Sequence, residues 1–273
     1  QILNTQMDIP TWVTGLILLV LTAMVILGGI QSIGKFTSFL VPFMILGYIA
    51  ISLIVLGMNL DKIGDAFGLI FHYAFSPIAA GGGFVGATMA AAIRYGVARG
   101  VFSNESGLGS APIAAAAAKT NDPVRQALVS MTQTFIDTLV VCTMTALVIL
   151  IAPFWQQGMS PSLLTMKSFE LYLGSFGSVT VVIATVLFAY STILGWSYYG
   201  EKAIEYIFGE KMVKIYRIIF IAIVMVGAMM KLSFVWDFSD LMNGMMAIPN
   251  LIALLLLSKV ISAETNRYFK TVK

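Results

Sequence analysis

The sequence predicts an all-α polytopic membrane protein. Of its 273 residues, 59% are hydrophobic and only 11% are charged, whereas soluble domains carry about 25% charged residues. The mean hydropathy is +0.91, and apolar stretches recur that approach or exceed the length of about 20 residues needed to cross a bilayer. The chain opens on Gln1 and shows no signal-peptide pattern, so we expect it to be a piece of a longer protein.

Composition also argues against several other classes of protein. A single cysteine, Cys142, and a single histidine, His72, give neither a disulfide framework nor a metal cluster. No cysteine, serine or carboxylate pair has a catalytic spacing, so we do not expect an enzyme or a resident cofactor. The net charge of +3 is weak support for a nucleic-acid partner, because most lysines and arginines flank apolar runs.

Seven apolar stretches are expected to span the membrane. The first two are uncharged and are separated by a short polar break at residues 32–35. The third has no clear end, the fourth contains one charged residue, Asp137, and the fifth contains none. The seventh has Pro249 near its expected start. In order, these spans are residues 11–31, 36–60, 67–93, 126–155, 171–200, 212–236 and 241–262.

The distribution of basic residues predicts the orientation. With the spans alternating, eleven lysines and arginines fall on one side of the membrane and three, Lys62, Lys167 and Lys231, on the other. Because basic loops are retained in the cytoplasm, we expect the first helix to enter from outside and the C-terminal tail to be cytoplasmic. Apolar-Pro helix starts of opposite orientation, at Pro42 and Pro249, hint at inverted repeats, although proline is common at helix starts anyway.

The third span is predicted to be interrupted over Ser103–Ala111. Gly107 and Gly109 disfavour helix, and Pro112 removes a backbone donor. Unwound backbone at membrane depth must be buried in protein or line a wet cavity, and transporters build solute and ion sites from such breaks. The alternative is an extramembrane loop, but residues 112–118 are then too short to span alone.

Four charged side chains near this break are candidates for a buried network: Arg94, Arg99, Glu105 and Asp137. Intramembrane ionisable groups are functional candidates by default, and we expect Asp137 to pair with one of the two arginines. It belongs to a polar stripe, at spacings of three and four residues, that also contains Gln126, Ser130, Gln133 or Thr134, and that is expected to face the interior of the bundle. A purely structural ion pair is the alternative.

The fifth span carries a polar and aromatic patch over residues 190–200. Thr192 and Trp196 lie four residues apart and share a helix face, and Gly195 leaves room beside them. The hydroxyls of Ser191 and Thr192 could ligate a cation, while the indole could wall a small pocket. The alternative is that these hydroxyls bond their own helix backbone and that the aromatic rings mark a membrane interface.

Three stretches together resemble a known family. They are residues 100–112, continuing through an Ala-rich run to residues 135–138; residues 189–202; and residues 246–251. Over essentially the whole chain the sequence resembles the alanine or glycine:cation symporters.

The resemblance implies a leucine-transporter-type fold made of two inverted five-helix repeats. Residues 1–65 would be the last two helices of repeat one, and residues 66–273 the five helices of repeat two, the first of which is discontinuous. Thr192 and Trp196 would line the amino-acid pocket, Ser191 and Thr192 would lie near a sodium position, and Ser103, Asn104 and Gly107 would add unwound backbone to the site. The broken helix of repeat one is absent from this chain.

The resulting expectation is a C-terminal part of a secondary active symporter in the plasma membrane. It would carry alanine or glycine into the cell with Na+, or with H+, as coupling ion, and it would need the missing N-terminal helices of the same protein. Its other surroundings would be membrane lipid, with no nucleic acid. The rival function is a passive channel or pore-forming subunit in which the unwound segment is a filter.

Overall fold

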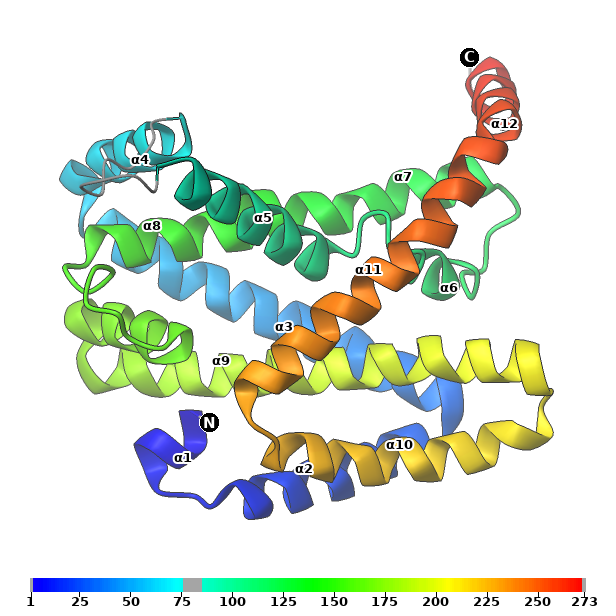
Figure 1. The fold of residues 1–273 in the computed structure, drawn as a ribbon, viewed down its shortest axis with the longest axis horizontal. Coiled ribbons are helices and arrows are strands. Elements are labelled where there is room, and N and C mark those ends of the chain that lie inside the picture. The colour runs from blue at the N-terminus through cyan, green and yellow to red at the C-terminus, as the bar shows by residue number, and fades with distance from the viewer. Residues whose placement is uncertain (1, 76–84, 272–273) are drawn as a thin grey trace. The chain divides into compact units, whose positions relative to one another are not determined.

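The computed structural model describes residues 2–75 and 85–271, and within those ranges it is helical without strands. This confirms the all-α prediction. Figure 1 shows the elements in chain order: α1 (Ile2–Met7), α2 (Thr11–Ile26), α3 (Gly29–Gly57), α4 (Leu60–Phe75), α5 (Val85–Asn104), α6 (Ala111–Ala115), α7 (Pro123–Thr134), the π-helix η1 (Phe135–Cys142), α8 (Thr143–Ile151), α9 (Pro161–Phe208), α10 (Lys211–Met229), α11 (Leu232–Leu256) and α12 (Ser258–Thr271).

Among the described residues, five helical stretches are long and apolar enough to cross a membrane. They are α3, the continuous run Pro123–Ile151 that joins α7, η1 and α8, then α9, α10 and α11. The apolar helix α2 has only 16 residues. Length and composition therefore support a multi-pass membrane protein.

The chain forms two compact units. The first combines Gln1–Gly86 with Val141–Met230, and the second combines Ala87–Val140 with Lys231–Lys273. In the first unit α3 packs against α8 and α9, and α10 packs against α2 and α9. Its core includes the fully buried side chains of Val55, Val148, Phe169 and Leu194.

Polar contacts hold the helices of the first unit in register. The hydroxyl groups of Tyr48 on α3 and Thr145 on α8 lie 2.7 Å apart. Between α9 and α10, the guanidinium of Arg217 donates to both carboxylate oxygens of Glu201, at 2.7 and 2.9 Å. Glu201 is only 5% exposed, so the first unit contains a buried bidentate ion pair.

Two of the predicted helix boundaries are wrong in the first half of the chain. The break expected at residues 32–35 falls at Leu27–Gly28 instead, and α3 starts at Gly29, whose φ of +70° suits glycine. The expected span 67–93 starts too late, because α4 already begins at Leu60. Its middle, residues 76–84, lies outside the described residues.

The later boundaries also need correction. The expected span 171–200 lies within the longer α9, which kinks at Gly174, where φ is +59°. The last break falls at residues 230–231 rather than 237–240, so Asp237 and Asp240 lie inside α11. Pro42 and Pro249 are interior residues of α3 and α11, not helix starts. These two prolines therefore do not support the presence of inverted repeats.

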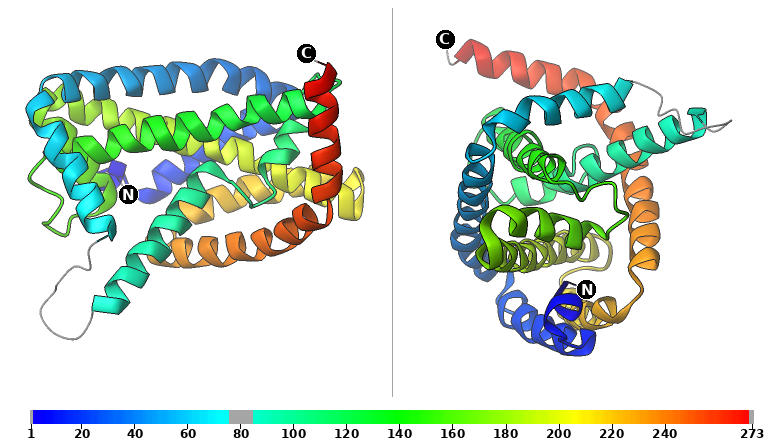
Figure 2. Two further views of the ribbon diagram at one scale, coloured as in Figure 1. Left: turned by 90° about the horizontal axis from the view of Figure 1, so that it is seen from above. Right: turned by 90° about the vertical axis from the view of Figure 1, so that its left-hand side faces the viewer.

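The second unit contains all of α5 except its first two residues, the short α6, α7, the first part of η1, α11 and α12. Helix α11 lies against the C-terminal part of α5 and the segment that follows it, through contacts made by Asp240 and Asn250. At Leu257 the chain turns, and α12 leaves in a different direction from α11 (Figure 2).

Candidate functional site

The predicted break after α5 is confirmed. Helix α5 ends at Asn104 and α6 begins at Ala111, so the break is shorter than the predicted Ser103–Ala111, and the residues at both of its expected ends are helical. Between them, Glu105, Gly107 and Gly109 have φ values of +57°, +84° and +83°. Residues in the left-handed region do not continue a right-handed α-helix. Backbone N–H and C=O groups of this segment are therefore available to partners outside a helix.

Glu105 is the residue of this break that is least suited to its conformation. A side-chain-bearing residue in the left-handed region costs roughly 1–2 kcal/mol relative to a right-handed helix. Its backbone N–H still donates to the carbonyl of Val101 at 2.8 Å, and its carboxylate accepts a hydrogen bond from the Ser110 hydroxyl at 2.7 Å. Ser110 is fully buried, so the carboxylate is held across the break.

The end of α5 is tied to the π-helix η1 by four polar side chains. Ser103 donates to the carboxylate of Asp137 at 2.7 Å, and the Asn104 amide donates to the Thr138 hydroxyl at 3.1 Å. Thr138 in turn donates to Asp137 at 3.1 Å. Because π-helical turns widen a helix and recur at functional sites, the break faces an irregular stretch of the neighbouring helix.

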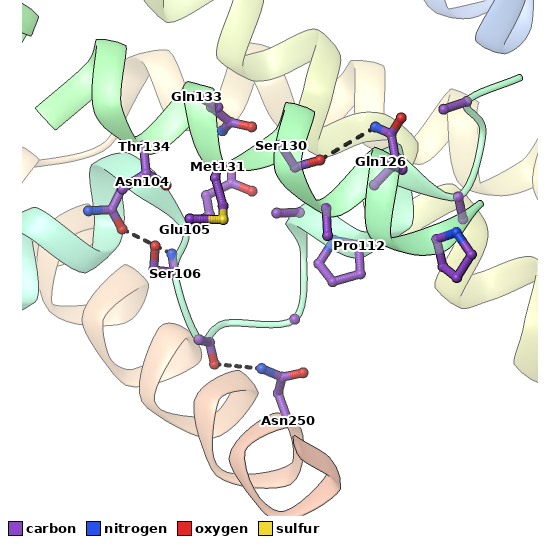
Figure 3. Close-up of a pocket in the computed structure, with 18 of the residues that line it drawn as sticks. Asn104, Glu105, Ser106, Pro112, Gln126, Ser130, Met131, Gln133, Thr134 and Asn250 are labelled. Carbon is purple, nitrogen blue, oxygen red and sulfur yellow. Dashed lines mark hydrogen bonds between the residues drawn. The ribbon is translucent and has the colours of Figure 1, made fainter. Parts of the chain in front are cut away.

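Asn250 of α11 anchors the middle of the break. Its amide donates to the carbonyl of Gly107 at 2.9 Å, and its side chain packs so closely on Gly109 that a Cβ added there would lie 3.0 Å from the amide oxygen. Figure 3 shows this contact between α11 and the unwound segment. The two glycines are thus needed both for their left-handed φ and, at Gly109, for the close approach of Asn250.

A cavity of about 620 Å³ opens beside the break, entirely within the second unit. The predicted polar stripe of α7 lines it through Gln126, Ser130, Gln133 and Thr134, and the unwound segment and Asn250 line other parts (Figure 3). Among the described lining residues, Glu105 is the one with an ionisable side chain. The cavity therefore combines amides and hydroxyls with one carboxylate, which favours a cationic or zwitterionic solute over an anion.

Arg99 does not pair with Asp137, so the predicted pairing with this arginine is wrong. Its Nη2 lies 2.5 Å from a carboxylate oxygen of Asp240 on α11, and its guanidinium lies 4.2 Å from the ring centroid of Trp236. The reason is that α11 continues through Asp240 instead of breaking there, which brings this carboxylate against α5. We call Arg99, Trp236 and Asp240 the α5–α11 clasp.

The other members of the expected charge network are also separated. Arg94 is exposed and lies 6.0 Å from the ring centroid of Tyr95. Glu105 bonds Ser110, and Asp137 bonds hydroxyl groups. A common network of the four charges is thus not formed in this structure, and hydroxyl groups and Asp240 take the places of the expected partners.

The patch on α9 belongs to the first unit. Ser191 and Thr192 both donate their hydroxyl protons to the carbonyl of Phe188, each at 2.9 Å, as the backbone-bonding alternative expects. A hydroxyl oxygen whose proton is engaged in this way keeps lone pairs free, so cation ligation remains chemically open to both. Trp196 packs edge-on against Tyr199.

Sequence reasoning missed three polar positions that the structure brings to the break: Asn250, Ser110 and Thr138. Each lies in or beside a motif quoted for the family resemblance, but an amide or a hydroxyl has no spacing pattern that would reveal its partner.

Comparison with known proteins decides the family. The sequence model of the sodium:alanine symporter family matches residues 1–273 of this chain. The chain belongs to this family.

Relatives within the sodium:alanine symporter family are close in sequence. The chain is 53% identical over 260 residues to the sodium/alanine symporter AgcS of Methanococcus maripaludis, which covers 94% of this chain and 56% of that protein. It is 48% identical over 268 residues to an uncharacterized transporter of Haemophilus influenzae, covering 97% and 59%. It is 38% identical over 261 residues to the probable sodium/glutamine symporter GlnT of Bacillus subtilis, covering 95% and 54%.

The chain thus spans somewhat more than half the length of these relatives. The family is one of symporters, which are transporters rather than enzymes.

Proposed function

We propose that this chain forms part of a secondary active transporter that moves a small neutral amino acid, alanine or glycine, into the cell together with Na+. The observation that carries the proposal is the break between α5 and α6, with its left-handed residues and the polar cavity beside it. Membership of the sodium:alanine symporter family supports the coupling ion and the class of solute. The named relatives differ in amino acid, sodium/alanine in one and sodium/glutamine in another, so the solute needs direct measurement.

The proposed architecture is the leucine-transporter fold in a multi-pass protein of the cell membrane. Residues 1–65 supply the last two helices of the first inverted repeat, and residues 66–273 supply the second repeat and a cytoplasmic tail. In this arrangement seven spans cross the bilayer, and α5 and α6 are the two halves of a discontinuous helix. The other half of the binding site comes from N-terminal helices of the same protein.

Each site residue has a proposed role. Ser103 and Asn104 at the end of α5 and Gly107 in the unwound segment bind the amino acid. Thr192 and Trp196 set the size of its side-chain pocket, and Ser191 with Thr192 ligate the cation. The hydrogen bonds from both hydroxyls to the Phe188 carbonyl leave oxygen lone pairs available for this last role.

The mechanism is alternating access. Na+ binding orders the site, the amino acid then binds to the ordered form, and the ligands shift the population toward the conformation that opens on the other side. The break needs flexible backbone at its glycines and fixed anchors beside them. Here these are the hydrogen bond from Ser103 to Asp137 just before the break and the hydrogen bond from Asn250 to Gly107 in its middle. No covalent chemistry is involved.

Uptake by the full-length protein in proteoliposomes tests the function. With Na+ outside and none inside, we expect labelled alanine to accumulate above its external concentration, and we expect accumulation to vanish when the Na+ gradient is collapsed. A channel would instead equilibrate alanine with or without a cation gradient. Accumulation driven by a proton gradient alone would show that the coupling ion is H+ rather than Na+.

Two substitutions test the proposed pocket. Thr192→Ala and Trp196→Ala remove the hydroxyl and the indole that we place beside the solute, so the half-saturating alanine concentration should rise severalfold. Phe220→Ala, on α10 and outside the proposed pocket, is a matched loss of an aromatic ring. If both site variants keep the affinity of the unchanged protein for alanine, Thr192 and Trp196 do not line the pocket. That result would leave the proposal of Na+-driven accumulation standing.

A further inference from the structure

One side of α3 carries an outward-facing apolar stripe with a cation near one end. Its members are three, four or seven residues apart and therefore share about 100° of the helix circumference: Ser32, Lys35, Phe36, Phe39, Phe43 and Leu46. Phe39, Phe43 and Leu46 are 79%, 68% and 67% exposed, whereas Tyr48 and Ile51 on the other side are buried. Helix α3 thus packs into the first unit with one side and turns these six residues, which we call the α3 stripe, outward.

The end of the stripe that carries the cation forms a groove with α2. Its volume is about 360 Å³, and it is lined by Val25 of α2 and by Ser32, Lys35, Phe36 and Phe39 of the stripe. The ring of Phe36 is held edge-on against Tyr190, with their centroids 5.7 Å apart. The Tyr190 hydroxyl in turn donates to the carbonyl of Leu21 at 2.8 Å. The groove therefore combines fixed apolar walls with one ammonium and one hydroxyl group.

Lys35 has no carboxylate partner in the part of the chain that the structure describes. The ion pairs formed there belong to other lysines and arginines, and Lys35 itself is exposed. An unpaired ammonium group beside apolar surface is stable only where its head can reach water or an anion. In a membrane protein, the phosphate groups of lipids are the anions at such a place.

The length of α3 places Lys35 near a membrane boundary. Its 29 residues extend over about 43 Å, which matches the thickness of about 40–45 Å of a bilayer with its headgroups. The hydrocarbon core of about 30 Å then begins roughly 7 Å from each helix end. Lys35 is six residues from the start of α3, and helical side chains point back toward the N-terminus, so its ammonium group reaches this boundary.

The apolar part of the stripe has the dimensions of one lipid leaflet. From Phe36 to Leu46 the helix rises about 15 Å, which is about half of the hydrocarbon thickness. An acyl chain whose headgroup lies at Lys35 would therefore follow the exposed side chains of Phe39, Phe43 and Leu46 toward the middle of the bilayer.

We propose that the α3 stripe binds an anionic phospholipid. The phosphate contacts the ammonium group of Lys35 and the hydroxyl group of Ser32, and an acyl chain lies along the phenylalanines. An apolar stripe alone would also accept a protein helix, but the unpaired cation at headgroup depth favours a lipid with net negative charge. This inference requires α3 to cross the membrane but does not depend on the transported solute.

Quenching of a fluorescent label by brominated lipid tests the proposal. In full-length protein with every native cysteine replaced, Cys142 included, a bimane label is attached at Phe43→Cys on the stripe. Ile183→Cys on α9, another exposed apolar position, is the matched control. The protein is reconstituted in mixtures of phosphatidylcholine and phosphatidylglycerol, with bromine on the acyl chains of one lipid or the other. Quenching at equal mole fraction then reports how often each lipid lies beside the label.

We expect phosphatidylglycerol to lie beside the Phe43 label about fivefold more often than phosphatidylcholine, because one lysine near an anionic lipid supplies about that factor. Both lipids should quench the Ile183 label equally. Lys35→Gln should remove the preference at the Phe43 label. Lys211→Gln, at the start of α10, removes the same charge elsewhere and should leave the preference unchanged.

Each of three results would overturn the proposal. Equal quenching of the Phe43 label by the two lipids would show that the stripe does not select an anionic lipid. Quenching of the Ile183 label but not of the Phe43 label would show that protein covers the stripe, whether from the same chain or from a second copy. A preference for phosphatidylglycerol that survives Lys35→Gln would show that this lysine does not hold the headgroup.

Discussion

Gly109 offers a direct test of the geometry of the break. In Gly109→Ala the new methyl group would lie 3.0 to 3.1 Å from three atoms of Asn250, so the amide must move and its hydrogen bond to Gly107 must weaken. The positive φ of +83° costs about 1–2 kcal/mol for alanine, and a lost hydrogen bond costs about 1 kcal/mol. We therefore expect the free energy of unfolding to fall by about 2–3 kcal/mol.

Reversible unfolding of the full-length protein in mixed detergent micelles measures this change. Gly96→Ala, in the interior of α5 where an added Cβ meets no atom within 4 Å, is the matched control and should raise the stability by up to about 1 kcal/mol. In an Asn250→Ala background the cost of Gly109→Ala should drop by about 1 kcal/mol, because the hydrogen bond from Asn250 to Gly107 is already absent. Equal stability of Gly109→Ala and Gly96→Ala would refute the left-handed, Asn250-packed conformation.

Three further substitutions probe contacts that the structure defines. Glu201→Gln breaks the buried ion pair between α9 and α10 and should lower the free energy of unfolding by about 3–5 kcal/mol. Glu205→Gln, from the half-exposed pair with Lys202, should change it by at most about 1 kcal/mol; equal effects would contradict the burial of Glu201. Asp137→Asn keeps an acceptor for the two hydroxyl groups and should cost only about 1 kcal/mol, so a loss above about 3 kcal/mol would instead indicate an ion pair. Arg99→Lys keeps the charge but loses the planar contact with the clasp indole, and should cost about 0.5–2 kcal/mol in the same assay, while Arg94→Lys at an exposed position should be neutral.

Composition and local chemistry were sufficient to predict the helical class and the position of the break. Glycines at 107 and 109 and a proline at 112 disfavour helix whatever surrounds them, and the structure breaks where they stand. The polar stripe of α7 was also predictable, because residues three and four apart share a helix face, and its members line the cavity.

Helix ends and charge partners were not predictable in the same way. Asp237 and Asp240 look like a polar loop in sequence, yet they lie inside α11. Asp237 is exposed, and an ion pair with Arg99 compensates the charge of Asp240. That compensation comes from a helix 141 positions away along the chain. Asn250 escaped notice for the same reason, since its partner is a backbone carbonyl that becomes available only after the helix has unwound.

The central claim is that the break and its cavity belong to the transport site, and cysteine accessibility tests it most directly. Ser130 lines the cavity, whereas its neighbour Val129 does not and is 58% exposed. In full-length protein with Cys142 replaced, we expect alanine together with Na+ to slow thiol labelling of Ser130→Cys severalfold and to leave Val129→Cys unchanged. Labelling of Ser130→Cys at the same rate with and without alanine and Na+ would contradict the account.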